Sequence, residues 1–201
     1  MNKQNLGLFL TALLISSACV LQIPEVKAAS AIVPLSVTVN GSLVISDADN
    51  DTMAGKDPTK NVNISVTPDL GTSNASGSAN FRIRTNRSTW RVTAQRTASD
   101  NGGTGIADAD VKLDVSKSAG SNANANSGVI ASPFTAQTDL SSVSTSSAVD
   151  VVTGSAKTSS AKDGNNSNNW FQLSTTYSIA PDFFYTPGTY STTITYSLVS
   201  P

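Results

Sequence analysis

The sequence predicts an all-β protein, an antiparallel β-sandwich of the immunoglobulin-like type, behind an N-terminal signal peptide. Apolar residues recur at every second position in short stretches along the chain, which is the period of a strand. Turn-forming Gly, Asn and Ser separate these stretches. After residue 28, no stretch keeps a helical period for three turns. Short strands without helices between them indicate two packed antiparallel sheets.

Length and composition favour one domain without catalytic chemistry. A chain of 201 residues is long enough for one domain with a proper core. The charged fraction is 13%, about half of the usual share. The chain has no histidine, and its one glutamate is Glu25, so the commonest general base and metal ligand is absent. We therefore expect no enzymatic activity, no metal and no cofactor.

Residues 1–28 are typical of an export signal. Lys3 supplies the positive charge, an apolar run follows, and residues 26–28 (Val-Lys-Ala) place small residues where a signal peptidase cleaves. The apolar run is about 16 residues long, shorter than a spanning helix needs, and no later stretch could span a membrane. We predict a secreted single domain over residues 29–201. Cys19 lies inside the signal, and its lipidation is left open.

The exported chain is predicted to open with a hairpin. Residues 32–39 alternate apolar and polar, Asn40 and Gly41 form turn chemistry, and residues 43–46 are a second apolar run. After a polar acidic loop, residues 61–68 alternate again and predict a further strand.

The middle of the chain predicts three strands. Residues 81–85 and 90–94 alternate on either side of a turn at 86–88, so they are expected to form a hairpin. Residues 111–115 alternate as well. Residues 116–128 contain nothing to bury and are predicted to be a long loop.

The last third contains the strongest pattern. Weak strand signals occur at 129–135 and 149–153, and a polar loop is expected at 154–169. Residues 170–179 and 190–198 then alternate regularly and are rich in β-branched and aromatic residues. We expect these final two strands in the core of a sheet.

Three aspartates in the acidic loop have a spacing that could hold calcium. Asp47, Asp49 and Asp51 stand at alternate positions, as in loops that wrap oxygen ligands around the ion. The full pattern also needs a glycine and a terminal glutamate, where this chain has Thr52 and Pro58. A solvated turn is therefore favoured, and whether the aspartates bind calcium stays open.

All five arginines fall between residues 82 and 96. If the strands at 81–85 and 90–94 form a hairpin, three guanidinium groups share one outer face, which suits carboxylate, phosphate or sugar groups. A solvated face that deters edge-to-edge aggregation is the alternative. Nucleic acid is not expected, because the net charge is -1 and no wide basic footprint exists. The candidate ligand-binding residues are Arg82, Arg84, Arg91, Trp90 and Tyr196.

Two segments resemble WxL domains, the wall-binding β domains secreted by Gram-positive bacteria. These are FRIRTNRSTWRVTA with the following VKLDV, and the terminal YSTTITYSLVSP. The two triplets would be residues 90–92 (Trp-Arg-Val) and 196–198 (Tyr-Ser-Leu), in which valine replaces leucine and tyrosine replaces tryptophan. The resemblance implies non-covalent attachment to peptidoglycan and assembly with other surface proteins.

The last strand is also similar to those of pilin and spore-coat-protein-U-like domains, which are completed by a strand from a neighbour. We therefore expect a secreted, non-enzymatic bacterial surface protein that functions in adhesion, binding cell-wall polymer or other surface proteins. The alternative is a structural subunit of a pilus or extracellular matrix fibre. The ligand, self-association, and whether the last strand closes its own domain are left open.

Overall fold

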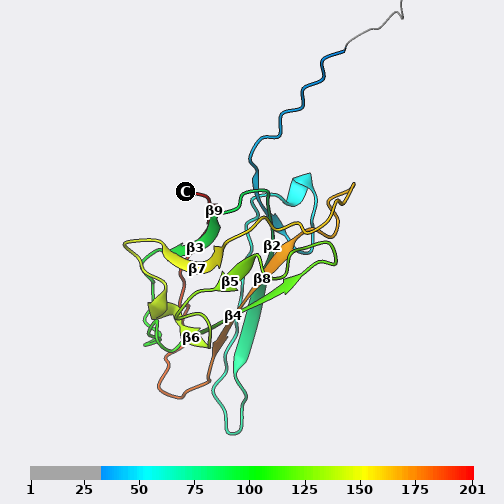
Figure 1. Ribbon diagram of the computed structural model, residues 1–201. Coiled ribbons are helices and arrows are strands. Elements are labelled where there is room, and N and C mark those ends of the chain that lie inside the picture. Colours follow the sequence, from blue (N-terminus) through cyan, green and yellow to red (C-terminus); the bar gives the residue numbers. More distant parts are fainter. Residues whose placement is uncertain (1–32) are drawn as a thin grey trace, which may run out of the picture. The chain divides into compact units, whose positions relative to one another are not determined.

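The computed structural model describes residues 33–201 (Figure 1). The chain divides into two units, Met1–Thr38 and Val39–Pro201. The predicted signal peptide and Cys19 lie outside the described residues. Within residues 33–201, no helix is long and apolar enough to cross a membrane.

The second unit contains two antiparallel sheets, which confirms the predicted all-β sandwich. The five-stranded sheet has the order β1-β2-β8-β4-β6, and the four-stranded sheet has the order β5-β7-β3-β9. Two short 3-10 helices, η1 (Met53–Gly55) and η2 (Leu140–Ser142), lie between strands. The strands are β1 (Leu43–Asp47), β2 (Ala75–Thr85), β3 (Trp90–Arg96), β4 (Lys112–Ala119), β5 (Gly128–Ile130), β6 (Thr138–Asp139), β7 (Val149–Gly154), β8 (Phe171–Ile179) and β9 (Ile194–Val199).

The core lies between the sheets, and strand alternation fills it. Every odd-numbered side chain of β8 is buried. These side chains point to one face of the strand, and that face of this central strand is turned toward the core. Trp90 on β3 meets Phe171 on β8 edge to face, with ring centroids 5.9 Å apart. Gly154 and Gly128 lie so close to the indole that a Cβ on either would collide with it. The indole N–H donates to the carbonyl of Ala156 at 2.7 Å.

The predicted N-terminal hairpin is wrong. Residues 33–42 form no strand, and β1 pairs with β2 instead. Neither Asn40 nor Gly41 has the positive φ that a two-residue hairpin turn needs. Instead Asn86 holds this stretch: its Oδ1 accepts from the backbone N–H of Ser42, and its Nδ2 donates to the carbonyl of Asn40, both at 2.8 Å. Side-chain hydrogen bonds therefore replace the turn.

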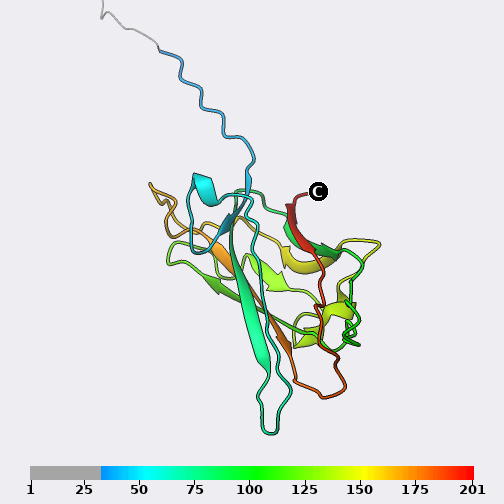
Figure 2. The ribbon, with the colours of Figure 1, turned by 180° about the vertical axis from the view of Figure 1, so that it is seen from behind.

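The predicted strand at 61–68 is extended but joins no ladder. Its alternation is nevertheless real, since Val62, Ile64 and Val66 are half-buried against the core. Val62 passes over Gly77 of β2, where a Cβ would lie 2.7 Å from its Cγ1. Figure 2 shows this segment running beside β2 on the rear side of the sandwich. Side-chain packing, and not backbone pairing, holds it.

The predicted hairpin of residues 81–85 and 90–94 is also wrong, because β2 and β3 lie in different sheets. Ile83 and Trp90 are both fully buried, and a sandwich buries one face of each sheet. Because the two strands belong to different sheets, the turn at 86–88 crosses from one sheet to the other. As a result, Arg82 and Arg84 of β2 lie on the opposite outer face from Arg91 of β3.

Several strand bounds, and the position of one strand in its sheet, differ from prediction. Residues 116–119 belong to β4 and pair with β8, so the long loop begins at Gly120. β2 begins at Ala75, although residues 75–80 carry almost no apolar side chains. β8 is central as expected, but β9 is the edge strand of its sheet. Where a strand begins and ends, and whether it lies at an edge, depends on the neighbouring strand. The alternation of apolar residues does not predict that neighbour.

Candidate functional site

An open groove lies between the edges of the two sheets. Its volume is about 240 Å³. β1 contributes Leu43 and Ile45, and β9 contributes the other wall. The groove is lined by Leu43, Ile45, Asp57, Tyr196, Ser197 and Leu198.

The groove exists because one sheet is a strand short. β2 faces β9, since the rings of Phe81 and Tyr196 lie 5.6 Å apart, and β8 faces β3 through the Phe171–Trp90 contact. β1 is the next strand beyond β2. It therefore faces the position beyond β9, where the described part of the chain places no strand. That position is the groove.

The edge of β9 that borders the groove has unpaired backbone groups. β9 pairs only with β3 among the described strands, in an antiparallel register. Thr97 donates its N–H to the carbonyl of Thr193 at 2.9 Å, which fixes the alternation along this ladder. The N–H and C=O groups of Ile194, Tyr196 and Leu198 consequently point away from β3, toward the groove.

The floor of the groove is uncharged and fixed. The hydroxyls of Tyr196 and Tyr177 are hydrogen-bonded at 2.8 Å. Burial raises the pKa of Tyr196 well above its ordinary value of 10.0, and burial also raises the pKa of Tyr177. Both phenols are therefore neutral at physiological pH. Leu198 is half-buried beside them.

The rim is built from β1 and the chain after η1. Lys56 forms an isolated antiparallel β-bridge with Ser46, and Asp57 donates its N–H to the carbonyl of Ile45 at 2.9 Å. These backbone contacts cover part of the β1 edge. Asp57 has a φ of 52°, a left-handed conformation that is uncommon outside glycine. Leu43 lies beyond this cover and is 36% exposed. The groove is thus open at Leu43 and bounded by a carboxylate at Asp57.

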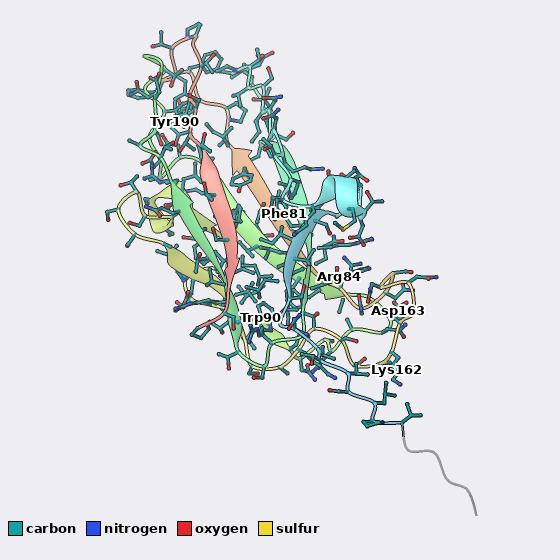
Figure 3. The ribbon with its side chains drawn as sticks, turned by 90° about the horizontal axis from the view of Figure 1, so that it is seen from above. Phe81, Arg84, Trp90, Lys162, Asp163 and Tyr190 are labelled. Carbon is teal, nitrogen blue, oxygen red and sulfur yellow. The ribbon has the colours of Figure 1, made fainter. Side chains whose placement is uncertain are left out.

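The arginines of β2 bind a carboxylate of the same chain. Arg84 makes two hydrogen bonds of 2.6 Å to Asp51, and Arg82 makes one of 2.9 Å. Burial alone would raise the pKa of Asp51, but hydrogen bonds from Arg84, Ser46 and Arg82 outweigh it and hold that pKa well below its usual range. Figure 3 shows Arg84 near the loop that carries Lys162 and Asp163. These guanidinium groups are structural partners of Asp51.

The other candidate ligand-binding residues are separated from this pair. Arg91 lies on the opposite sheet and is 3.7 Å from Asp150, both partly exposed. Trp90 is 1% exposed and belongs to the core. Tyr196 lines the groove. The structure therefore does not bring the five predicted residues together on one surface.

The three aspartates of the acidic loop are bound by cations of the chain itself. Lys60 Nζ lies 2.8 Å from Asp47 and 3.0 Å from Asp49, while Asp51 is held by the arginines of β2. Over residues 33–201, no group of three acidic, histidine or cysteine side chains is placed to hold a metal ion. These ion pairs balance the negative charge of the acidic loop within the chain itself.

Comparison with known proteins found no family model that matches the chain and no significant match among curated proteins. The resemblance to WxL domains, and to pilin and spore-coat-protein-U-like domains, stays a prediction.

Sequence reasoning missed Leu43, Ile45 and Leu198 as groove residues. All three lie in stretches with alternating or apolar patterns, so the sequence marks them as inward-facing. Alternation does not distinguish a fully buried position from a half-buried one, so it could not show that these residues line an open groove. The one sequence signal for an accessible edge is that residues 194–199 contain neither a charge nor a proline.

Proposed function

We propose that this protein is a secreted, non-enzymatic component of a bacterial cell surface that attaches to other protein chains, as a structural subunit of a pilus or extracellular matrix fibre. The observation that carries the proposal is the unpaired edge of β9 beside a half-open core. An exposed sheet edge is a template on which another chain can add a strand.

The other sheet edges of the described chain are short or covered, and β9 is neither. β5 and β6 have three and two residues, and the edge of β1 is partly closed by Lys56 and Asp57. Proteins usually protect an edge with charges, proline, a bulge or short length. β9 has six residues, Ile-Thr-Tyr-Ser-Leu-Val, none of them charged. An edge kept in this state supports a role in strand addition.

Binding of cell-wall polymer has less support. It depended on a shared arginine face, but Arg82 and Arg84 are bound to Asp51, and Arg91 lies on the other sheet. Arg91 is the member of that set with the most exposed side chain, at 48%.

Export is supported by residues 1–28. N-terminal sequencing of extracellular material should find a chain that begins near Ala29. An intact Met1, or a lipid on Cys19, would contradict this part of the proposal.

Sedimentation of the exported protein tests the assembly role. Association follows mass action, so the average mass should rise over an about hundred-fold increase in concentration. A mass that stays at one subunit throughout this range, with no fibre on the producing cells, would argue against a fibre subunit.

A further inference from the structure

We infer that the groove binds residues 33–39 of a second copy of this chain, added as a strand to the free edge of β9. The inference rests on the proposed function, and it names the partner.

Residues 33–39 have the properties of a strand that lacks a sheet. Val33, Leu35, Val37 and Val39 alternate with Pro34, Ser36 and Thr38, so an extended backbone places all four on one face. These four side chains are 78% to 87% exposed, and the segment joins no ladder. A contiguous exposed apolar face of this kind marks an interaction site.

The chemistry of the segment matches the groove. The groove is lined by uncharged side chains except for Asp57 at its rim, and residues 32–42 contain no charge at all. An added strand would therefore desolvate no charge of its own. Its backbone would pair with the outward N–H and C=O groups of Tyr196 and Leu198, and its inward side chains would cover Leu43 and Ile45.

The local structure at residues 40–42 favours another copy over the segment's own groove. Asn86 binds the backbone of Asn40 and Ser42, and the guanidinium group of Arg87 fills the space beside Gly41. Folding the segment back would need a tight turn at Asn40 and Gly41, which would break these contacts. Donation to a second copy leaves them intact.

Charge placed on the inward face of the segment tests the inference. Leu35→Asp with Val37→Asp in the full exported protein should weaken self-association by about 100-fold, because two apolar contacts are lost and two carboxylates would be buried. The matched control is Ser36→Asp with Thr38→Asp, which adds the same charge to the outward face and should associate like the parent. Sedimentation over a concentration series measures both, and equal thermal melts show that the fold is unchanged.

The outcomes separate this inference from the proposed function. If the inward-face variant associates as strongly as the parent, the assembly role survives and residues 33–39 are not the occupant. If the parent does not associate at any concentration, both fail.

Single cysteines identify the two surfaces in contact. The exported chain from Ala29 has no cysteine of its own, so Val37→Cys protein mixed with Leu43→Cys protein should give a disulfide-linked heterodimer under mild oxidation. Ser36→Cys mixed with Leu43→Cys is the control and should crosslink at least about ten-fold more slowly, because its side chain faces outward. A double variant with Val37→Cys and Leu43→Cys that closes only within one chain would overturn the choice of a second copy.

Discussion

The hydroxyl of Tyr177 on β8 lies 2.8 Å from the hydroxyl of Tyr196 on β9, so one hydrogen bond joins the two sheets beside the groove. Among the strands of residues 33–201, β9 has a neighbour on one side only. The tyrosine pair and the Phe81 ring therefore hold this edge strand against the opposite sheet. β9 is thus held in place although the backbone groups on its outer side pair with no strand of the described chain.

Tyr196→Phe should lower the free energy of unfolding by about 1 kcal/mol at neutral pH, because the hydroxyl of Tyr177 loses its partner. The raised pKa of Tyr196 also predicts a pH dependence. The folded protein keeps this proton above pH 10, where the unfolded chain releases it, so the stability is complete below pH 10 and is lost as the pH rises further. Denaturant unfolding from pH 7 to 11 should show a smaller alkaline loss in the variant. Thr195→Ala, on the exposed face of β9, should leave the profile unchanged.

Asp51→Asn should destabilise the fold by about 1.5 to 3 kcal/mol, because the hydrogen bonds of two arginines to a charged group are weakened. Asp49 is the matched control, since its side chain is 76% exposed and Lys60 is its one ion-pair partner within residues 33–201. Asp49→Asn should change stability by less than about 1 kcal/mol. The lowered pKa of Asp51 means that its contribution is present above pH 3.8 and is lost as the pH falls below that value. Chemical denaturation at pH 7 and pH 3 measures both effects. Equal losses for the two variants would contradict this account.

Gly154→Ala should cost about 1 to 3 kcal/mol, because the new methyl group would overlap the Trp90 indole in a packed core. Gly164→Ala is the control, since no atom lies within 4 Å of a Cβ there. Thermal melts followed by tryptophan fluorescence compare the two. A Gly154→Ala variant that melts like the parent would mean that the indole has room to move.

Deleting residues 191–201 should unfold the domain. Ile194, Tyr196 and Leu198 would leave the core, each worth at least about 1.5 kcal/mol, against a typical net stability of about 5 to 15 kcal/mol. Trimming only residues 199–201 removes the 2.7 Å bond from Ser200 to the carbonyl of Thr89 and the terminal pairing of Val199 with Arg91, and should cost about 1 to 2 kcal/mol. Circular dichroism and melting curves distinguish the two truncations. A long truncation that still melts cooperatively near the parent temperature would show that β9 is dispensable.

Replacing single arginines separates wall binding from stability. Arg84→Ser should lower the melting temperature, because it removes two hydrogen bonds to Asp51. Arg91→Ser removes only a partly exposed pair with Asp150 and should leave the melt nearly unchanged. Pull-down with purified cell walls at low salt then tests Arg91 alone. Weaker retention of the folded Arg91→Ser protein would favour the wall-polymer hypothesis.

The sequence by itself determined the fold class and which side chains face inward. Period-two alternation is a property of each strand, so β8 could be predicted over nearly its full length, and even residues 61–66 turn their apolar side chains to the core without forming a strand. The same local rule could not predict pairing, because a ladder depends on which backbone lies alongside. Residues 75–80 therefore became a strand without an apolar pattern, and residues 33–39 did not become one despite a clear pattern.

Only the tertiary structure decided the candidate site. The predicted arginine face required β2 and β3 to be neighbours, but the two strands lie in opposite sheets and turn Ile83 and Trp90 into the shared core from either side. The groove depends on a difference between sheets of five and four strands, a property of the whole assembly of strands that no segment contains. Local sequence sets the direction of each side chain, whereas the packing of two sheets sets which edges remain open, because the core can close only where both layers supply a strand.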